Sequence, residues 1–577
     1  MKNNPEGGNI LKKAFIVTLV AAVLVLAGMQ ARAADGKLTA KFNQISGLVN
    51  QQISKWDMSE KLSKEEVLDP NTSSKKFKKV STGYFWGGPR TIWLRAKYTV
   101  PDKVLNMPVA GSKISINVCI EDFAELYVNG KLEQSFRQAS NVITLTENAK
   151  PGDVYYIAIQ ASRKDRDTGL LRGVNLRYSI LEDIARKVGG VQESMGSLDL
   201  LLSLSGEDSA KWKGVLDKAA DAIDVSALEN GQPQKFYASL DKSREILKPV
   251  SAIIKKYDMY LIGYSHIDPA WLWDKAEGEH IVVKGTSLQI LNLMKNFPYF
   301  LYAANQMHCY RWMERDYPEI FKQIQEKVKS GEWEPVGAEW VEPDGNLPSG
   351  EAYVRQFMYG RKYSKEKLGL VSTIGWTPDS FGYNWGLPQI LAKSDMRGFV
   401  TQKISWNDTT RFPYNLFWWK GPDGSKVLVY FPQGGYGESV HGSTMAQQLA
   451  NMKAKHNVNS NLVIFGIGDH GGGIPVDYLE RAMALKEDPL YPNIKFVSTE
   501  KVFDDMFKAD KTSKFPTWNT ELYLEYHRGT YTTQANTKNN NRRNEIRMMN
   551  SERFSTIASI AAGLKYPFDK IEEAWKI

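Results

Sequence analysis

Between residues 256 and 498 the sequence alternates short apolar runs with longer amphipathic stretches, and this alternation limits the fold more than any other feature. The apolar runs have the length of buried strands, and the stretches between them have the spacing of helices with one apolar face. Strand followed by helix, repeated, is typical of a mostly parallel sheet, either closed into a barrel or open. The predicted strands are 260–264, 300–304, 333–337, 371–376, 398–402, 426–431 and 462–466. The predicted helices between them are 288–296, 319–330, 349–368, 444–454 and 476–485.

Ionisable side chains directly follow several of these predicted strands. His266 and Asp268 come after the first strand and Asp379 after the fourth. The third strand is followed by Glu339, Glu342, Asp344 and Asn346, and the last strand by Asp469 and His470. Because ligands bind at the carboxyl ends of parallel strands, we expect these side chains to gather at one edge of the sheet.

The pair His266 and Asp268 has two interpretations. Two residues apart on an extended segment, the imidazole and the carboxylate lie on the same side and suit a metal ion; an ordinary hydrogen-bonded pair is the alternative. Asp379 could equally be a helix N-cap. The whole cluster suits two chemistries. Glycoside hydrolysis needs two carboxylates beside an anomeric carbon, and metal-assisted hydrolysis needs three or four N or O ligands. The 27 Tyr, 23 Phe and 16 Trp fit a carbohydrate or nucleotide ligand.

The N-terminal half has a different texture. Residues 34–74 are polar and predicted to be partly helical, with Phe42, Ile45, Leu48, Ile53 and Trp56 at near-helical spacing. Residues 75–182 contain runs that alternate like half-buried strands, at 91–100, 113–118, 124–128 and 154–159, with a turn signal at Asn129-Gly130. This predicts an antiparallel β-sandwich. Residues 124–136 resemble galactose-binding-like sandwiches attached to glycosidases, so the sandwich either binds sugar or is purely structural. Residues 183–255 are predicted to be a helical connector.

The first 33 residues have the features of a signal peptide. Lys12 and Lys13 precede an apolar run from Ala14 to Gly28, and Ala31-Arg32-Ala33 provides a cleavage site; a retained membrane anchor is the alternative. We therefore expect a secreted or periplasmic protein without a stable membrane anchor. The net charge of +9 is spread along the chain, which indicates a solvated surface and no nucleic-acid partner. The 2 cysteines give no disulfide framework.

Five long motifs carry a family resemblance. They are HIDPAWLW at 266–273, WVEPDGNLPSGE at 340–351, WTPDSFGYNWGLPQIL at 376–391, GIGDHGGGIP at 466–475 and LYLEYHRGTYTTQA at 522–535. In this order they resemble the motifs of the retaining α-mannosidases of glycoside hydrolase family 38. The resemblance covers about residues 255 to 577. Together with the β-sandwich and helical connector predicted from the pattern, it leads us to expect a multidomain α+β protein with a barrel-like β/α catalytic domain with a mostly parallel sheet over 256–540, and the start of a helical bundle over 541–577.

The resemblance also implies roles for individual residues. His266 and Asp268 match two zinc ligands, and Asp379 matches the catalytic nucleophile, which also contacts the metal. Asp469 matches the general acid/base. Trp271, Asp344, Trp376, His527, Arg528 and Tyr531 would line the sugar subsite. The implied activity is that of an exo-acting, retaining α-mannosidase that hydrolyses α-mannosidic bonds of mannose-containing oligosaccharides, with one Zn²⁺ bound to the 2- and 3-hydroxyls of mannose. The two catalytic carboxyls should then lie about 5 to 5.5 Å apart.

One departure from the family pattern affects the metal. The family's fourth ligand is a His in a motif resembling FHDILPGS, and this sequence stops at Lys576-Ile577, before such a motif. We therefore expect the sequence to be the N-terminal part of such an enzyme, with a weak or absent zinc site. His470 and His527 are the conceivable substitute ligands. The alternative functions are a catalytically impaired glycan-binding fragment and a metal-dependent polysaccharide deacetylase.

Overall fold

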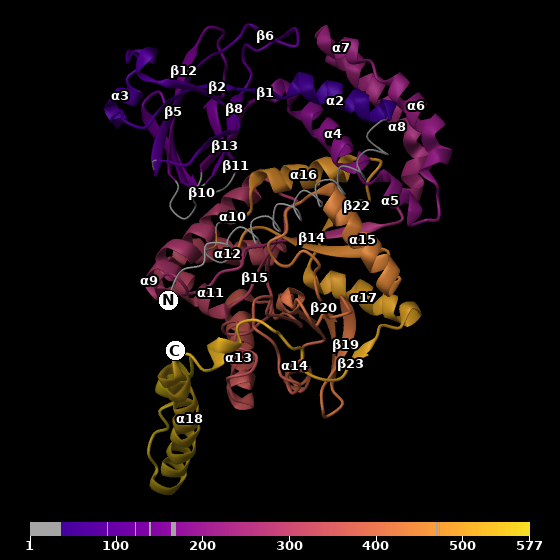
Figure 1. Ribbon diagram of the computed structural model, residues 1–577. Helices are drawn as coiled ribbons and strands as arrows, with labels where there is room; N and C mark the ends of the chain where they lie inside the picture. Colours follow the sequence, from indigo (N-terminus) through magenta and orange to yellow (C-terminus); the bar gives the residue numbers. More distant parts are fainter. Residues whose placement is uncertain are drawn as a thin grey trace, which may run out of the picture. The chain divides into compact units, whose positions relative to one another are not determined.

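The computed structural model of the protein describes residues 36–576 except 89, 122, 138–139, 163–168, 469–470 and 472 (Figure 1). The predicted signal peptide lies outside the described residues. The chain divides into two compact units. The first comprises the chain up to Tyr257 together with His441–Gln447 and Pro475–Asn493. The second comprises Asp258–Val440, Gln448–Ile474 and Ile494–Ile577.

Two antiparallel sheets form the β part of the first unit. One has the order β1 (Gln51–Gln52), β13 (Gly169–Tyr178), β8 (Ile114–Glu121) and β11 (Ser140–Thr146), and β4 (Tyr84–Trp86) also pairs with β13. The other has the order β10 (Lys131–Arg137), β9 (Phe123–Val128), β12 (Val154–Ser162), β5 (Thr91–Thr99), β2 (Lys55–Ser59) and β3 (Lys78–Ser81). A small hairpin joins β6 (Lys103–Val104) and β7 (Met107–Pro108). All four strands predicted in this region are present.

The predicted Asn129-Gly130 turn connects β9 and β10. Val128 pairs with Lys131, so the hairpin loop consists of Asn129 and Gly130. Both have positive φ, 49° for Asn129 and 79° for Gly130. This is the backbone that a two-residue hairpin requires, and Asn and Gly are the residues that adopt it most readily.

The predicted helix near the N-terminus is shorter than its apolar pattern indicated. Helix α2 covers Lys37–Val49, and α3 covers Lys64–Leu68. Trp56, expected at helical spacing, lies instead in β2, which pairs with β3 and β5. The apolar spacing was therefore a wrong indication of helix beyond Val49, because Trp56 is buried within a paired strand instead.

The helices predicted at 183–255 are present and continue the first unit. They are α4 (Ser179–Met195), α5 (Leu198–Ser203), η2 (Ser209–Trp212), α6 (Lys213–Ala222), α7 (Val225–Glu229) and α8 (Pro233–Ile254). Helix α16 (Val476–Glu487) packs against α4. A Cβ on Gly190 of α4 would lie 2.2 Å from the carbonyl oxygen of Ala484, so this close helix contact requires glycine.

Two sheets form the β part of the second unit. In the first, β16 (Trp333–Pro335), β15 (Tyr302–Ala304), β14 (Asp258–Tyr264) and β21 (Ser460–Phe465) are parallel neighbours. A fifth strand, β22 (Asn493–Phe496), pairs with β14. In the second sheet the order is β17 (Ile374–Trp376), β18 (Gly398–Val400), β20 (Lys426–Tyr430), β19 (Leu416–Lys420) and β23 (Thr517–Trp518). Strand β19, which the sequence pattern did not predict, is antiparallel to β20.

Single contacts link the edges of these two sheets. The N–H of Gly337, just after β16, donates to the carbonyl of Ile374 in β17 at 3.1 Å. Glu438, which follows β20, forms a parallel bridge with Phe465 of β21. One buried cluster contains residues from strands of both sheets, among them Ile262, Ile374, Leu428 and Ile464. The strands β14, β15, β16, β17, β18, β20 and β21 therefore follow one another around a shared core.

Helices precede and follow these strands along the chain. They are α9 (Lys275–Glu277), η3 (Gly278–Val283), α10 (Lys284–Asn296), α11 (Met307–Asp316), α12 (Pro318–Ser330), α13 (Gly350–Tyr363), η4 (Ser364–Leu368), α14 (Leu387–Lys393), η5 (Lys403–Trp406), α15 (Gly442–His456), α17 (Thr499–Ser513), η6 (Arg528–Tyr531), α18 (Ala535–Ala562) and α19 (Phe568–Lys576). Among the described residues, none of the helices combines the length and the apolar character that a membrane span needs.

Candidate active site

Strand β14 positions the first two predicted ligands. Its residues from Met259 to Tyr264 are buried, and the chain leaves the sheet at Ser265 and His266. Nε2 of His266 lies 3.2 Å from Oδ1 of Asp268. His266 is 2% exposed, whereas the Asp268 side chain is partly exposed. The imidazole is therefore fixed by packing, and the carboxylate faces a space that solvent or a ligand can reach.

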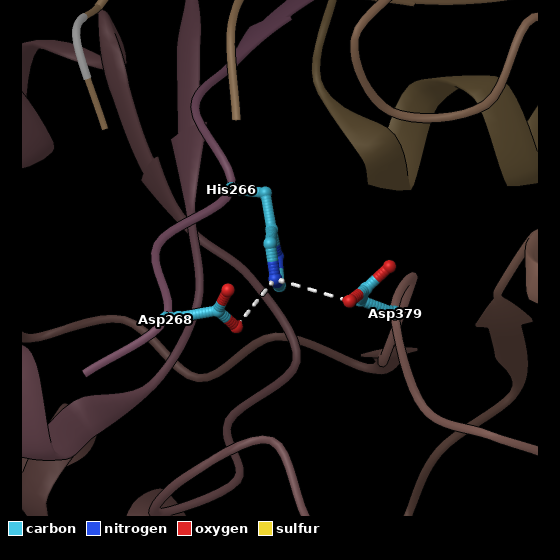
Figure 2. A group of neighbouring side chains, drawn as sticks. All are labelled: His266, Asp268 and Asp379. Atoms are coloured by element: carbon cyan, nitrogen blue, oxygen red, sulfur yellow. Dashed lines mark hydrogen bonds and ion pairs between the residues drawn. The ribbon is translucent and has the colours of Figure 1, made fainter. Parts of the chain in front are cut away.

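Asp379 joins this pair from β17. Its Oδ2 lies 3.7 Å from Nε2 of His266, and Figure 2 shows the imidazole pointing between the two carboxylates. One ligand atom from each of His266, Asp268 and Asp379 lies within 4.8 Å of the other two. Asp379 does not cap a helix, because the next helix, α14, begins at Leu387. An imidazole and two carboxylates are a donor set that zinc and related divalent ions accept, so these residues could hold a metal.

Glu342, which follows β16, contacts both Asp379 and His266. Its Oε1 accepts a hydrogen bond from the backbone N–H of Asp379 at 2.6 Å, and its Oε2 lies 3.6 Å from Nδ1 of His266. Burial raises the pKa of Glu342 to about 7, against the opposite effect of His266. Burial opposes a charge on His266, but Asp268, Glu342 and Asp379 together raise its pKa to about 9.

Lys403 contacts the opposite side of Asp379. It begins the short helix η5 just after β18, its side chain is 5% exposed, and its Nζ forms an ion pair with Oδ1 of Asp379. The same ammonium lies 3.7 Å from the centroid of the Trp406 ring and 5.4 Å from that of Phe381. The two oxygens of Asp379 are thus divided: Oδ1 faces Lys403, and Oδ2 faces His266.

Aromatic side chains surround the imidazole. The ring centroid of Tyr436 lies 4.7 Å from that of His266. Tyr264 donates from its hydroxyl to Oδ1 of Asn305 at 2.9 Å and packs edge-on against Trp376 at 5.3 Å. Trp376, expected to line a sugar subsite, has no exposed surface and belongs to the core cluster, so in this structure its ring has no face for a ligand. Glu339, another of the strand-end residues, is also fully buried, and burial holds its pKa well above the usual value.

Two other predicted subsite residues, Trp271 and Asp344, contact their own neighbours in the sequence. Trp271 is 60% exposed and packs edge-on against Trp273. Oδ1 of Asp344 accepts hydrogen bonds from the backbone N–H groups of Asn346 and Leu347, at 2.8 and 2.7 Å, and so closes a turn.

Three of the predicted subsite residues lie on the segment before α18. The ring of His527 lies 4.8 Å from that of Phe381, two residues after Asp379. Tyr531 donates to the carbonyl of Phe381 at 2.9 Å. Arg528 lies 3.4 Å from the hydroxyl of Tyr523. His527 and Tyr531 therefore lie close to the Asp379 loop.

Asp469 and His470 lie outside the described residues. At Gly468, a described residue, a Cβ would lie 3.0 Å from the Cβ of His266 and 2.6 Å from the Tyr436 ring. The segment that leads to Asp469 therefore passes beside His266. The expected separation of Asp379 and Asp469 stays a prediction.

Sequence reasoning missed the role of Lys403. It stands one residue beyond the predicted strand 398–402, so the rule that led to Asp379 would also have identified it. A lysine at a strand end is neither a usual metal ligand nor a carboxylate, so the chemistry that singles out Asp379 does not single out Lys403. The position of Glu342 at a strand end predicts that it lies near the cluster, but its contacts with the Asp379 backbone and His266 are visible only in the structure.

Two family profiles match the chain. The profile described as Glycosyl hydrolases family 38 N-terminal domain matches residues 256–521, and that described as Alpha mannosidase middle domain matches residues 525–577. Together they cover more than half of the chain and include every residue of the candidate site.

Curated relatives show the same similarity. Alpha-mannosidase G of Dictyostelium discoideum is 36% identical over 320 residues, which are 55% of this chain and 29% of the relative. Alpha-mannosidase 2C1 of Homo sapiens is 37% identical over 385 residues, 66% of this chain and 36% of the relative. Alpha-mannosidase of Saccharomyces cerevisiae is 35% identical over 356 residues, 60% of this chain and 33% of the relative. The chain spans about a third of the length of these relatives.

Proposed function

Because the chain belongs to glycosyl hydrolase family 38, we propose that it carries the site of an exo-acting, retaining α-mannosidase that acts on mannose-containing oligosaccharides. The observation that carries this proposal is the cluster of His266, Asp268 and Asp379 at the carboxyl ends of parallel strands. The predicted leader at residues 1–33 supports the further proposal that the protein is secreted or periplasmic.

His266, Asp268 and Asp379 would hold a zinc ion, for which imidazole and carboxylate are ordinary ligands. A bound zinc would supply a Lewis acid for the 2- and 3-hydroxyls of mannose. The protein itself fixes the two side chains that come from different strands. His266 is held by burial, and Asp379 is held through its backbone N–H by Glu342 and through Oδ1 by Lys403.

Asp379 is the proposed nucleophile and Asp469 the proposed acid/base. A carboxylate oxygen of Asp379 forms a bond to the anomeric carbon while the bond to the leaving oxygen breaks, and Asp469 gives its proton to that oxygen. Asp469 then takes a proton from water, the water oxygen bonds to the anomeric carbon, and Asp379 is released. Two displacements retain the configuration.

Hydrolysis of an aryl α-mannoside by the purified chain, with and without added Zn²⁺, tests this function. We expect release of mannose that increases with Zn²⁺ and is lost in Asp379→Asn. The matched control is Asp395→Asn, since Asp395 is an exposed aspartate with a φ of 59° that Asn tolerates. Release of acetate from an acetylated polysaccharide would favour a deacetylase, and glycan binding without hydrolysis would favour a binding fragment.

A further inference from the structure

The β-sandwich carries a cleft that the proposed hydrolysis does not use. It has a volume of about 810 Å³ and lies on the sheet that contains β2, β3, β5 and β12. On β5 the hydroxyl of Tyr98 contacts that of Tyr178 in the other sheet, so even-numbered residues of β5 face the space between the sheets. Because side chains alternate along a strand, Arg95 and Lys97 lie on the opposite, outer face.

Strand register places charged residues from three strands together on this outer face. Lys97 is opposite Tyr156 of β12, and Arg95 is opposite Asp57 of β2. Asp57 is in turn opposite Lys79 of β3, and Lys55 stands two residues before Asp57 on the same face. We call Lys55, Asp57, Lys79, Arg95, Lys97 and Tyr156 the sandwich cleft; all six line it.

The segment between β2 and β3 forms a wall of the cleft. Val67 of α3 and Phe77 form a buried cluster with Trp93 and Tyr127, so this segment covers part of the outer face. Arg95 fixes this segment: its guanidinium donates to the carbonyls of Asp69 and Thr72 at 3.2 and 2.6 Å and lies 3.9 Å from the centroid of the Phe77 ring. The wall is therefore held in place without a ligand, which lowers the entropic cost of binding one.

The charged side chains that line the cleft are mostly basic. Four cationic side chains line the sandwich cleft against one carboxylate, Asp57, which forms ion pairs with Lys79 and Arg95. Lys55 and Lys97 are exposed, and within the described part of the chain neither forms an ion pair. Lysines on an edge strand commonly prevent aggregation. Here β2 and β5 are interior strands of the sheet, and Lys55 and Lys97 stand just beyond the last β2–β5 pair, Asp57 with Arg95.

The chemistry of the cleft indicates its ligand. The ring of Tyr156 is 36% exposed and lies opposite Lys97, so a planar face for a sugar stands beside a cation. Hydroxyl groups of Thr72, Ser74 and Ser81 also line the cleft and can bond sugar hydroxyls. The volume is that of a site for a ligand of a few sugar rings. We propose that the sandwich cleft binds an oligosaccharide that carries carboxylate or sulfate groups, independently of the mannosidase site.

Calorimetric titration of the full chain tests this proposal. The ligands are a hexamer of galacturonic acid, which is a carboxylate, and a sulfated dextran oligosaccharide, with neutral dextran of the same length as the reference. We expect the charged ligands to bind with an affinity that falls as NaCl is raised from 50 to 300 mM, and neutral dextran to bind much more weakly. The salt dependence is measured on the unaltered protein and needs no variant to fold.

Variants then locate the site. Lys55→Ala and Lys97→Ala should each raise the dissociation constant about five-fold, and Tyr156→Ala should do the same by removing the stacking face. The matched control is Lys150→Ala, an exposed lysine of the same sandwich outside the cleft, which should leave binding unchanged. Equal binding of neutral dextran, complete competition by an equivalent concentration of inorganic sulfate, or an equal loss in Lys150→Ala would each overturn the proposal.

Discussion

Replacing Glu334 by Gln should remove part of the pH dependence of the protein's stability. Glu334 lies on β16 and is 7% exposed. Its carboxylate accepts hydrogen bonds from the backbone N–H of Thr499 at 2.9 and 3.1 Å and from the Thr499 hydroxyl at 2.7 Å, at the start of α17. Burial raises the pKa of Glu334 from 4.5 to about 7, although the Thr499 hydrogen bonds act in the opposite direction.

The direction of the effect depends on which state holds the proton. Below pH 4.5 the folded and unfolded chains both hold it, so the group has no influence on stability. Between pH 4.5 and about 7 the unfolded chain loses the proton first, and the folded state becomes less stable as the pH rises. Across this interval the free energy of unfolding falls by about 3 kcal/mol, and above pH 7 this loss stays constant. For the second unit, unfolding as a whole, a change of about 3 kcal/mol amounts to about 5 °C in Tm.

Thermal unfolding of wild type and Glu334→Gln, followed from pH 4.5 to 8, measures the effect. Comparison at each pH removes the contributions of other buried acids such as Glu342. We expect the Tm of Glu334→Gln relative to wild type to rise by about 5 °C across this range, because Gln carries no charge to bury. Glu326→Gln, at an exposed position of α12, should run parallel to wild type. Parallel curves for Glu334→Gln and wild type would refute the reasoning.

Three further predictions concern the site and the helix contact. Lys403→Met should lower kcat/KM for an aryl α-mannoside roughly 10- to 100-fold, because Asp379 loses its buried charged partner. The control Lys393→Met, at an exposed position, should leave kcat/KM unchanged. A change below about three-fold in Lys403→Met would exclude a role for Lys403. Trp271→Ala should raise KM about ten-fold without lowering Tm, since the ring is exposed. The control Leu272→Ala, at 80% exposure, should leave KM and Tm unchanged. An unchanged KM in Trp271→Ala would show that Trp271 does not belong to the sugar subsite. Gly190→Ala should destabilise the protein by about 1–3 kcal/mol, because the added methyl group clashes with Ala484. The control Gly189→Ala, whose methyl group meets no atom within 4 Å, should not destabilise it. Equal Tm values for the two variants would show that α4 and α16 separate easily.

Strand-end reasoning selected residues that the structure brings together, and the order of the parallel strands explains why. His266 and Asp379 are far apart in sequence, yet β14, β15, β16 and β17 follow one another around the core, so their carboxyl ends meet. The same reasoning could not show β19. Its run of apolar residues has no alternation, and a tight turn with Gly424 at a φ of 89° returns the chain to β20 without a helix. The rule of alternating strand and helix does not anticipate such a hairpin.

Burial was the other quantity that the sequence did not determine. Trp376 and Asp379 stand three residues apart in one motif, but Trp376 ends a strand and points into the core, whereas Asp379 lies on the loop beyond. Trp56 shows the converse: its spacing indicated helix, and sheet pairing decided its conformation. Local pattern identifies which residues are apolar or ionisable, and the neighbouring elements decide which of them solvent can reach.

The contacts of Asp379 are consistent with both roles proposed for it, nucleophile and metal ligand. Its Oδ2 faces His266, on the side where the candidate metal ligands meet, and its Oδ1 faces Lys403. Lys403 is itself fixed, since its ammonium rests on Trp406, and Glu342 restrains the backbone N–H of Asp379. With both ends of the side chain held, the carboxylate cannot rotate to exchange its oxygens without breaking an ion pair. A nucleophile that also binds a metal needs such a restraint, because free rotation would present the attacking oxygen in the wrong direction for part of the time.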